Sequence, residues 1–348
     1  MTSVWRQRSG KTTEKDRGAI NLQERIERLC EALRAGDRRS LARAITLVES
    51  TRAADRALTD GLLTALGPAP SSSLRVGLSG TPGVGKSTFI EALGLQLTAK
   101  AHRVAVLAVD PSSARSGGSI LGDKTRMEQL SRHPAAFIRP SPTRASLGGV
   151  ARRTREAIRL CEAAGYDIGI VDTVGVGQSE TLVADMTEVF LLLLAPAGGD
   201  DLQGVKRGVM EWADLVLVNK ADGDLAAEAM RTAADYASAL RLMRGKADDP
   251  EGYPMALTLS AAMGTGIMEA WDKVIALIGA RRASGAFADT RARQSLSWFR
   301  AELRDQLLAA LETQAGDVSA LEAAVARGAG SAGADAGATT GASDAGTG

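Results

Sequence analysis

Several residue types are scarce in this chain of 348 residues, and each scarcity argues against a class of protein. Only two cysteines are present, Cys30 and Cys161, without CxxC spacing, so we expect neither a disulfide scaffold nor a cysteine-ligated structural zinc. The two histidines, His102 and His133, lie far apart in the sequence and show no pattern of a partner carboxylate, so we expect them at the surface. The longest apolar run, Val189–Ala195, is much shorter than the ~20 residues of a membrane-spanning helix.

An excess of either charge is also missing, because 42 Lys and Arg residues stand against 41 Asp and Glu residues, for a net charge of +1. That balance gives no bulk electrostatic reason to expect a nucleic-acid partner. The first residues contain no apolar core of a signal peptide, so we expect a cytoplasmic protein that does not enter a membrane. The length favours two domains, or one large α/β domain with appendages.

Both ends of the chain differ from its middle. Residues 1–19 are polar and mixed in charge, and we expect a disordered N-terminus there. In residues 20–70 the apolar side chains recur at helical spacing, which predicts an N-terminal extension of two or three helices with a break at Gly36 and Asp37. Residues 328–348 are rich in glycine and alanine without a large apolar side chain, and we expect them to be disordered.

A helical arm is expected in residues 284–327. Its main helix, predicted from Arg291 to about Glu312, carries one apolar face, and a second, alanine-rich helix is expected from Val318 to Ala326. An apolar stripe outside the main core packs either on that core or on a partner chain, and we favour self-association of two copies. The apolar face consists of Leu296, Phe299, Leu303 and Leu307.

The middle of the chain, residues 71–283, alternates short apolar runs with helical stretches. Each run is too short for a buried helix, and several end in Asp, Gly or Asn. Strands that alternate with helices predict an α/β core in which a mostly parallel sheet is covered by helices on both faces. The predicted strands are Leu74–Ser79, Val104–Val109, Ile168–Val171, Val189–Leu194, Leu215–Val218 and Met255–Leu259.

The strongest motif follows the first predicted strand and has the pattern GxxxxGK[ST]. Its glycines allow backbone N–H groups to curl around phosphate oxygens, and the following helix presents its positive N-terminal end to them. Lys86 would bridge the β- and γ-phosphates, and the Ser87 hydroxyl would be a ligand of Mg²⁺. The predicted nucleotide-binding loop consists of Gly80, Thr81, Pro82, Gly83, Val84, Gly85, Lys86, Ser87 and Thr88.

A second motif, NKxD, follows the predicted strand Leu215–Val218 and indicates guanine. The Asp222 carboxylate can accept from guanine N1–H and N2–H₂ together, whereas adenine offers no such pair of donors. The Lys220 stem would lie along the base, and Asn219 would tie this loop to the phosphate-binding loop. The residues where a backbone N–H would meet guanine O6, after the next strand, are Ser260, Ala261 and Ala262.

Residues after another predicted strand are candidates for catalysis. Asp172 follows the strand and would hold Mg²⁺ through a water, while Gly175 would offer its N–H to the γ-phosphate. Ras-like GTPases carry a water-orienting glutamine directly after that glycine, where this chain has Val176. The sequence does not show whether Gln178 or Glu180 orients the water instead. We therefore expect slow intrinsic hydrolysis of GTP that needs help from a partner.

Asp110 follows the strand Val104–Val109 and places a second carboxylate on the same edge of the sheet. It would join the Mg²⁺ shell or orient water, and a turn-forming Asp-Pro is the plain alternative. The predicted Mg²⁺ ligands are thus Ser87, Asp110 and Asp172. The predicted catalytic residues are Lys86, Asp110, Asp172, Gln178 and Glu180.

Together these motifs resemble the methylmalonyl-CoA mutase-associated GTPases of the MeaB/ArgK type, in the P-loop class that includes the signal-recognition-particle GTPases. The resemblance covers about residues 20–310. It implies a P-loop NTPase domain of the SIMIBI type between an N-terminal helical extension and a C-terminal helical dimerisation arm. Besides the NKAD, the matching segments are GDxxxLARAxTLxES at Gly36–Ser50, GTPGVGKST at Gly80–Thr88, VLAVDPSS at Val106–Ser113, GGSILGDKTRM at Gly117–Met127, DTVGVGQSE at Asp172–Glu180 and GGDDLQGVKRG at Gly198–Gly208.

The resemblance implies a homodimeric GTPase that binds an adenosylcobalamin-dependent methylmalonyl-CoA mutase. In such proteins GTP binding and hydrolysis gate cofactor loading and protect or reactivate the mutase, and hydrolysis is slow without it. The resemblance also assigns Asp200, Gln203 and Lys206 to an extra switch that couples the nucleotide state to the mutase. The expected ligands are GTP or GDP and Mg²⁺, with no nucleic acid and no membrane.

Other functions stay open on the residues alone. A small-molecule kinase would share the P-loop, although it has no use for NKxD. A GTPase of nickel-enzyme maturation would need a His/Cys cluster, which two histidines and two separated cysteines do not supply. A related cobalamin-dependent acyl-CoA mutase of different specificity is a further alternative client, because client choice depends on surfaces that motifs do not reveal.

Overall fold

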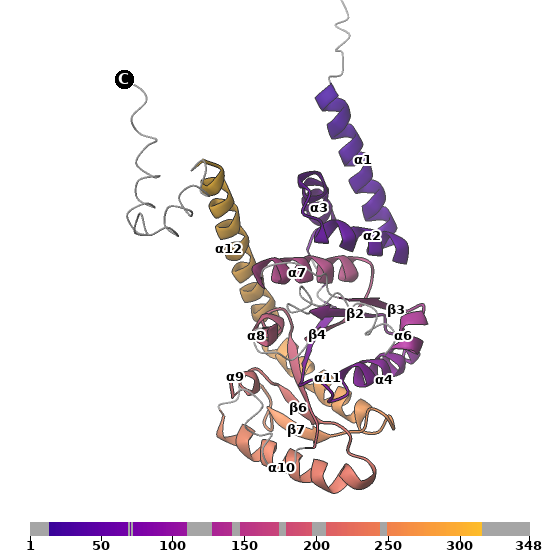
Figure 1. Ribbon diagram of the computed structural model, residues 1–348, viewed down its shortest axis with the longest axis vertical. Coiled ribbons are helices and arrows are strands. Elements are labelled where there is room, and N and C mark those ends of the chain that lie inside the picture. Colours follow the sequence, from indigo (N-terminus) through magenta and orange to yellow (C-terminus); the bar gives the residue numbers. More distant parts are fainter. Residues whose placement is uncertain are drawn as a thin grey trace, which may run out of the picture. The chain divides into compact units, whose positions relative to one another are not determined.

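One parallel sheet forms the centre of the protein (Figure 1). The computed structural model describes residues 14–68, 70, 72–109, 127–140, 147–173, 179–196, 207–243 and 249–314. In them the strand order is β3-β2-β4-β1-β5-β6-β7, and every neighbouring pair is parallel, which confirms the predicted α/β class. The strands are β1 (Leu74–Ser79), β2 (Val104–Val109), β3 (Ala136–Arg139), β4 (Ile168–Thr173), β5 (Val189–Leu194), β6 (Leu215–Val218) and β7 (Met255–Thr258).

Two differences from the predicted strands have local causes. The edge strand β3 has only four residues, so its apolar run is too short to stand out in the sequence. Strand β4 continues past Val171 because the backbone of Asp172 and Thr173 stays paired with β2. The backbone hydrogen bonds of a strand can thus continue through polar residues, which the apolar pattern of the sequence does not reveal.

Helices cover both faces of the sheet. Alternate strand residues on one face pack against α4 (Lys86–Ala99), α6 (Glu128–Arg132) and α11 (Ile267–Ser284) in a single buried cluster. On the other side lie α7 (Leu147–Ala163) against β2 and β4, α8 (Ser179–Ala184) against β1 and β4, and α10 (Ala226–Leu242) against β6 and β7. The strands are buried from both sides, which explains their nearly continuous apolar sequences.

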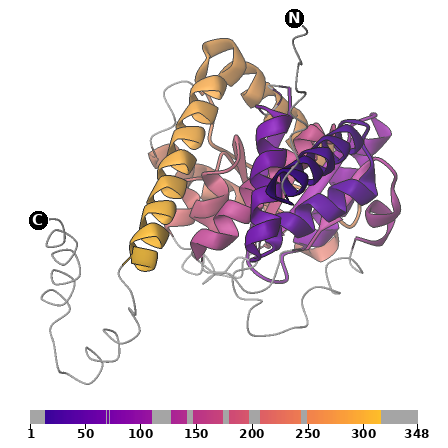
Figure 2. The same ribbon diagram turned by 90° about the horizontal axis from the view of Figure 1, so that it is seen from above.

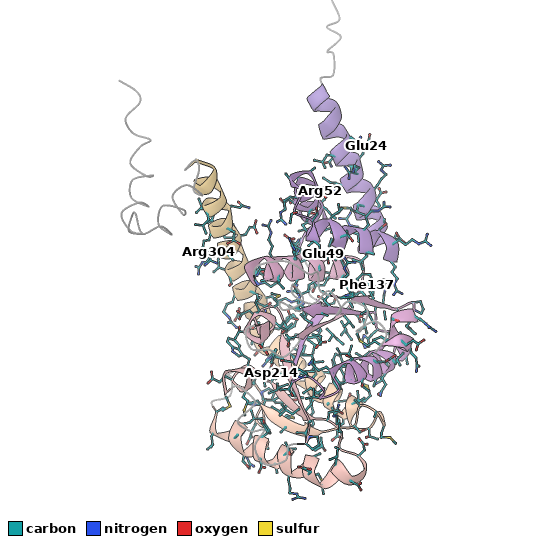
Figure 3. All side chains as sticks on the ribbon, viewed as in Figure 1. Glu24, Glu49, Arg52, Phe137, Asp214 and Arg304 are labelled. Carbon is teal, nitrogen blue, oxygen red and sulfur yellow. The ribbon has the colours of Figure 1, made fainter. Side chains whose placement is uncertain are left out.

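The predicted N-terminal extension consists of α1 (Glu14–Arg34), α2 (Arg38–Glu49) and α3 (Ala53–Leu66), which contact one another and α7 (Figures 1 and 2). The boundary placed at residue 20 is wrong, because α1 begins at Glu14. Apolar periodicity carries no signal in the polar residues before Ile20, although Glu, Lys and Arg favour a helix. Ion pairs attach the extension to the sheet domain, namely Arg56–Glu156 and Arg139–Glu49 (Glu49 is labelled in Figure 3).

The chain divides after Asp289 into two compact units, a few residues beyond the predicted start of the C-terminal arm. The long helix α12 runs over Ala286–Gln314, so most of it belongs to the second unit. The predicted second helix and the tail lie outside the described residues. The apolar side chains of the predicted stripe are exposed, among them Phe299 at 64%, with Leu296, Leu303 and Leu307.

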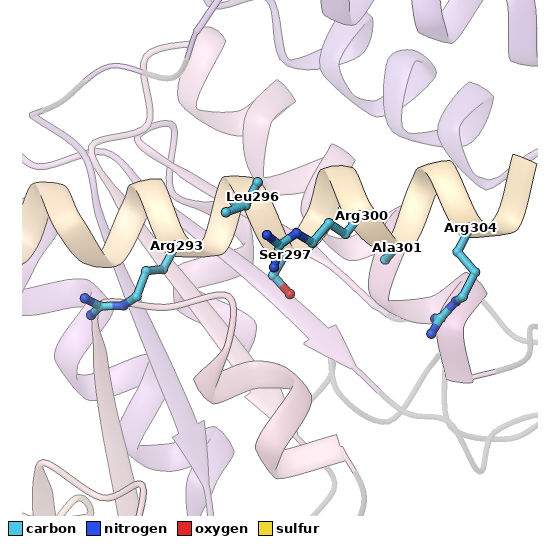
Figure 4. Close-up of a pocket in the computed structure, with 6 residues that line it drawn as sticks. All are labelled: Arg293, Leu296, Ser297, Arg300, Ala301 and Arg304. Atoms are coloured by element: carbon cyan, nitrogen blue, oxygen red, sulfur yellow. The ribbon is translucent and has the colours of Figure 1, made fainter.

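A basic surface lies beside that stripe on α12. Arg293, Arg300 and Arg304 line a cavity of about 600 Å³ together with Ser297 (Figure 4). In the described part of the chain, no helix is long and apolar enough to cross a membrane.

Buried charges connect the amino-terminal ends of the strands. Arg75 in β1 forms a two-point ion pair with Glu162 of α7, with N–O distances of 2.8 and 2.9 Å. The backbone N–H of Arg75 donates to Glu188, which directly precedes β5, at 2.7 Å. Burial opposes the charge on Arg75, but Glu162 and Glu188 outweigh it, and the net effect raises the pKa of the guanidinium.

Arg281 near the end of α11 extends this network. Its guanidinium donates to Asp214, which precedes β6, at 2.5 Å and to Asp249 at 2.6 and 2.7 Å. A further bond of 2.6 Å reaches the carbonyl of Glu188. The side chains of Arg281, Asp214 and Asp249 are almost fully buried (Asp214 is labelled in Figure 3), so each charge depends on the others.

Replacing Arg281 by methionine is therefore expected to lower the free energy of unfolding by about 3–5 kcal/mol, since two carboxylates would stay buried without their cation. Equilibrium urea denaturation measures this, with Arg231→Ala on the exposed side of α10 as the control, expected within about 0.5 kcal/mol of wild type. A loss below about 1 kcal/mol for Arg281→Met would show that the carboxylates find other compensation.

Candidate functional site

The predicted phosphate-binding loop connects β1 with α4 at the carboxyl edge of the sheet, and its backbone requires glycine. A Cβ on Gly80 would lie 2.3 Å from the carbonyl oxygen of Leu193 in β5, and one on Gly85 would lie 2.6 Å from Asn219 Nδ2. Gly83 and Gly85 have φ values of +85° and +94°, which L side chains rarely adopt. The loop is therefore packed tightly against β5 and the base-recognition loop.

Helix α4 begins at Lys86, and its N-cap residue Gly85 provides no side-chain capping bond. The first N–H groups of such a helix suit an anion, because they have no partner within the helix and the dipole is positive there. Lys86 Nζ donates to the carbonyl of Gly80 at 2.5 Å, so the ammonium group lies inside the loop. Phe89 and Ile90 are buried and fix this first turn against the sheet. The arrangement fits the phosphates of a nucleotide.

Asn219 connects three loops through one side chain. Its Nδ2 donates to the carbonyl of Val84 in the phosphate-binding loop at 2.8 Å. Its Oδ1 accepts from the N–H of Ala261 at 2.8 Å, and the residue is only 2% exposed. The predicted tie between the NKxD loop and the phosphate-binding loop is thus present. The loop at Ser260–Ala262 is held by the same amide.

The other NKxD residues face outward. Lys220 has φ +59°, an uncommon value for a residue with a side chain, and its long stem is exposed next to the loop. The neighbouring backbone is fixed, because Ala221 N–H donates to Leu259 O at 3.0 Å. Asp222 is exposed in extended conformation just before the short 3-10 helix η1 (Gly223–Leu225). Lys220 and Asp222 are therefore accessible to a base from solvent.

Asp172 and Thr173 end strand β4 beside β1. Asp172 pairs in register with Leu78, and Thr173 Oγ1 donates to Ser79 Oγ at 2.9 Å. Asp172 is partly buried at the same edge as the phosphate-binding loop. Glu180, in the first turn of α8, is only 3% exposed, so its carboxylate faces the protein interior.

Several predicted site residues lie outside the described residues, and so the structure does not place them. They are Asp110, Gly175, Gln178, Asp200, Gln203 and Lys206.

Side chains without a motif also matter near these loops. Ser79 joins β1 to β4, and Glu91 joins α4 to α6, yet neither belongs to a recognisable pattern. His102 is partly exposed, and its Nδ1 lies 2.6 Å from Asp167 Oδ2, a carboxylate partner that the sequence pattern did not indicate. The two are far apart in the sequence, and only the pairing of β2 with β4 brings them together. Cys161 is buried, and this burial raises the pKa of its thiol, so the residue packs as a small apolar side chain.

Comparisons with known proteins agree with this geometry. The family model described as methylmalonyl Co-A mutase-associated GTPase MeaB matches residues 41–316. GTPase ArgK of Escherichia coli K12 is 51% identical over 276 residues, which cover 79% of this chain and 83% of that protein. The mitochondrial methylmalonic aciduria type A homolog of Mus musculus is 50% identical over 298 residues, with 83% of this chain and 71% of that protein covered.

A solved structure supports the fold. A crystal structure described as a LAO/AO transport system kinase has a TM-score of 0.71 and 39% sequence identity, and the match covers 90% of this chain and 96% of that chain. The residues matched by the family model include the phosphate-binding loop, the NKxD motif and the Ser260–Ala262 loop.

Proposed function

The chain belongs to the methylmalonyl-CoA mutase-associated GTPase family, and on that premise we propose that it is a Mg²⁺-dependent GTPase that serves an adenosylcobalamin-dependent methylmalonyl-CoA mutase. Its nucleotide cycle would gate cofactor loading and protect or reactivate the mutase. Nucleotide binding is supported best by the hydrogen bonds of the Asn219 side chain, which connect the phosphate-binding loop with both loops predicted to contact the base.

The residues of the site divide the work between phosphate and base. Backbone N–H groups of the loop from Gly80 to Gly85 and of the first turn of α4 would bind the phosphates, with Lys86 moving its ammonium group onto the β- and γ-phosphate oxygens. Asp222 would accept the two guanine donors, and Lys220 would cover the base. The Lys86 ammonium group already lies inside the loop, so it would need to move only a short way to reach the phosphate oxygens.

The donor set fits Mg²⁺, because Ser87 and Asp172 offer hydroxyl and carboxylate oxygens, which are hard ligands. Ser87 is in the first turn of α4 and Asp172 ends β4 at the same edge of the sheet. Asp110 would complete the set. Mg²⁺, when bound, would neutralise the negative charge that develops on the phosphates during hydrolysis.

Water for hydrolysis would be positioned by residues after β4. Gly175 would bind the γ-phosphate through its N–H, and Gln178 and Glu180 are the candidates for orienting the water. Glu180 faces the interior, so its use in this task would require α8 to move when nucleotide binds. This need for rearrangement supports a slow enzyme that a partner accelerates.

The partner assignment rests on the family description, which names the mutase. We propose that Asp200, Gln203 and Lys206 couple the nucleotide state to the mutase. A homodimer is supported by the exposed apolar stripe of α12, because such a stripe is typical of a surface that another helix covers. A related cobalamin-dependent acyl-CoA mutase is the alternative client.

GTP turnover with and without a stoichiometric methylmalonyl-CoA mutase from the same source tests this proposal. We expect slow hydrolysis of GTP alone, strong stimulation by the mutase, and no such stimulation with ATP. Lys206→Ala is expected to keep the intrinsic rate and to lose stimulation, whereas Lys100→Ala, at the far end of α4, keeps both. GTP hydrolysis that ignores the mutase would retain the GTPase and refute this partner.

A further inference from the structure

Helix α6 lies between the helix of the phosphate-binding loop and the N-terminal extension. It has five residues, fewer than an isolated helix needs to be stable in water, and its N-cap residue Met127 makes no side-chain capping bond. It packs beside α4 (Figure 1) and reaches the first residue of α2 through hydrogen bonds. Its stability must therefore come from groups on these neighbouring elements.

The N-terminal end of α6 is capped by α4. One carboxylate oxygen of Glu91 accepts from the backbone N–H groups of Gln129 at 2.7 Å and Leu130 at 3.3 Å. A negative charge at this end also complements the helix dipole. Directly beneath, the Leu130 side chain is fully buried against Gly94 of α4, where an added Cβ would lie 2.5 Å from a Leu130 methyl group. Helices α4 and α6 are therefore joined both by hydrogen bonds and by close packing.

The C-terminal end of α6 is capped by the N-terminal extension. The Arg38 guanidinium donates to the carbonyls of Ser131 at 2.9 Å and His133 at 3.3 Å. A positive charge is favourable at this end of a helix. Arg38 is itself fixed, because it begins α2, and the preceding Asp37 caps that helix through the N–H groups of Arg39 and Ser40.

We propose that Glu91 and Arg38 are positioning residues for GTP hydrolysis, and that through α6 they hold the phosphate-loop helix against the N-terminal extension. This rests on the proposed role of the loop. Glu91 is on the same helix as Lys86, little more than one turn further along, so it limits how far that first turn can tilt. Contacts of Lys86 and Ser87 that strengthen in the transition state depend on that orientation.

Single-turnover and steady-state GTP hydrolysis by the full chain test the proposal. Glu91→Ala and Arg38→Ala are each expected to lower kcat about 5- to 20-fold while KM stays within about twofold, because displacement by a fraction of an ångström affects the transition state more than binding. The double variant is expected to be no slower than the slower single variant, since both act through α6. Glu91→Gln, whose amide oxygen still accepts, is expected to restore most of kcat.

Two matched controls separate positioning from general loss of charge. Asp235→Ala removes an exposed carboxylate of α10, away from α6, and Arg39→Ala removes the exposed neighbour of Arg38; both are expected to keep wild-type kcat. A lower melting temperature with unchanged kcat in Glu91→Ala, or additive losses in the double variant, would overturn the proposal. Where Glu91→Ala does not fold, Arg38→Ala against Arg38→Lys gives the same comparison. A wild-type chain without GTP turnover would instead refute the proposed function.

Discussion

Replacing Lys86 by alanine is expected to lower kcat for GTP hydrolysis by about 10²–10³-fold. The ammonium group lies inside the loop, where it donates to Gly80 O at 2.5 Å, so it is close to the position that phosphate oxygens would take. Its charge would matter most when negative charge develops on the transferred group, and the rate should fall more than the affinity. Rapid-quench measurement of GTP turnover, with binding measured separately, checks both.

The fold should survive this change. Lys86 contributes hydrogen bonds to two loop carbonyls, of which one is 3.5 Å long, and a hydrogen bond from a charged group contributes about 1.5–3 kcal/mol, a minor share of the stability of a folded domain. Lys100→Ala removes a lysine from the other end of α4 and is expected to leave hydrolysis unchanged. Wild-type turnover in Lys86→Ala would show that this loop does not carry the phosphates.

The central sheet was predictable from the sequence because its strands are buried on both faces and so appear as continuous apolar runs. The phosphate-binding loop was predictable because each of its residues is constrained locally: Gly83 and Gly85 by φ, and Gly80 by the approach of Leu193. The start of α1 and the short strand β3 could not be predicted, because polar or very short segments carry no periodic apolar pattern.

Contacts between segments that are distant in the sequence could not be predicted for a different reason. The pairs Glu91–Leu130, Arg281–Asp214 and His102–Asp167 join residues whose spacing has no period, and each depends on which helices and strands become neighbours in the fold. The tie from Asn219 to Val84 was the exception, because a motif of known chemistry fixed both ends. Motifs thus reveal the groups that bind a ligand, whereas the groups that hold those motifs in place require the fold.

Asp222→Asn is expected to weaken GTP binding by about 10²-fold or more and to leave ATP binding within about threefold. Guanine presents donors at N1 and N2, and a carboxylate accepts from both, whereas an amide places its own N–H₂ against one of them. Xanthine carries an oxygen at that second position, so the same change should make XTP a better substrate. Asp222 is exposed beside the fixed Ala221 backbone, so the substitution should alter the contact without disturbing the loop.

Gain of XTP hydrolysis is the sharper result, because damage to the loop cannot produce it. Asp224→Asn, two residues further along and outside the motif, is the matched control and should change neither GTP nor XTP turnover. Equal loss of GTP and ATP binding in Asp222→Asn would remove the basis for guanine recognition and return the small-molecule kinase to consideration. A selective loss of GTP binding together with a gain of XTP hydrolysis would place the base against Asp222. The amino donor of guanine at position 2 is an oxygen acceptor in xanthine, and only a residue in direct contact with the base would respond to that exchange.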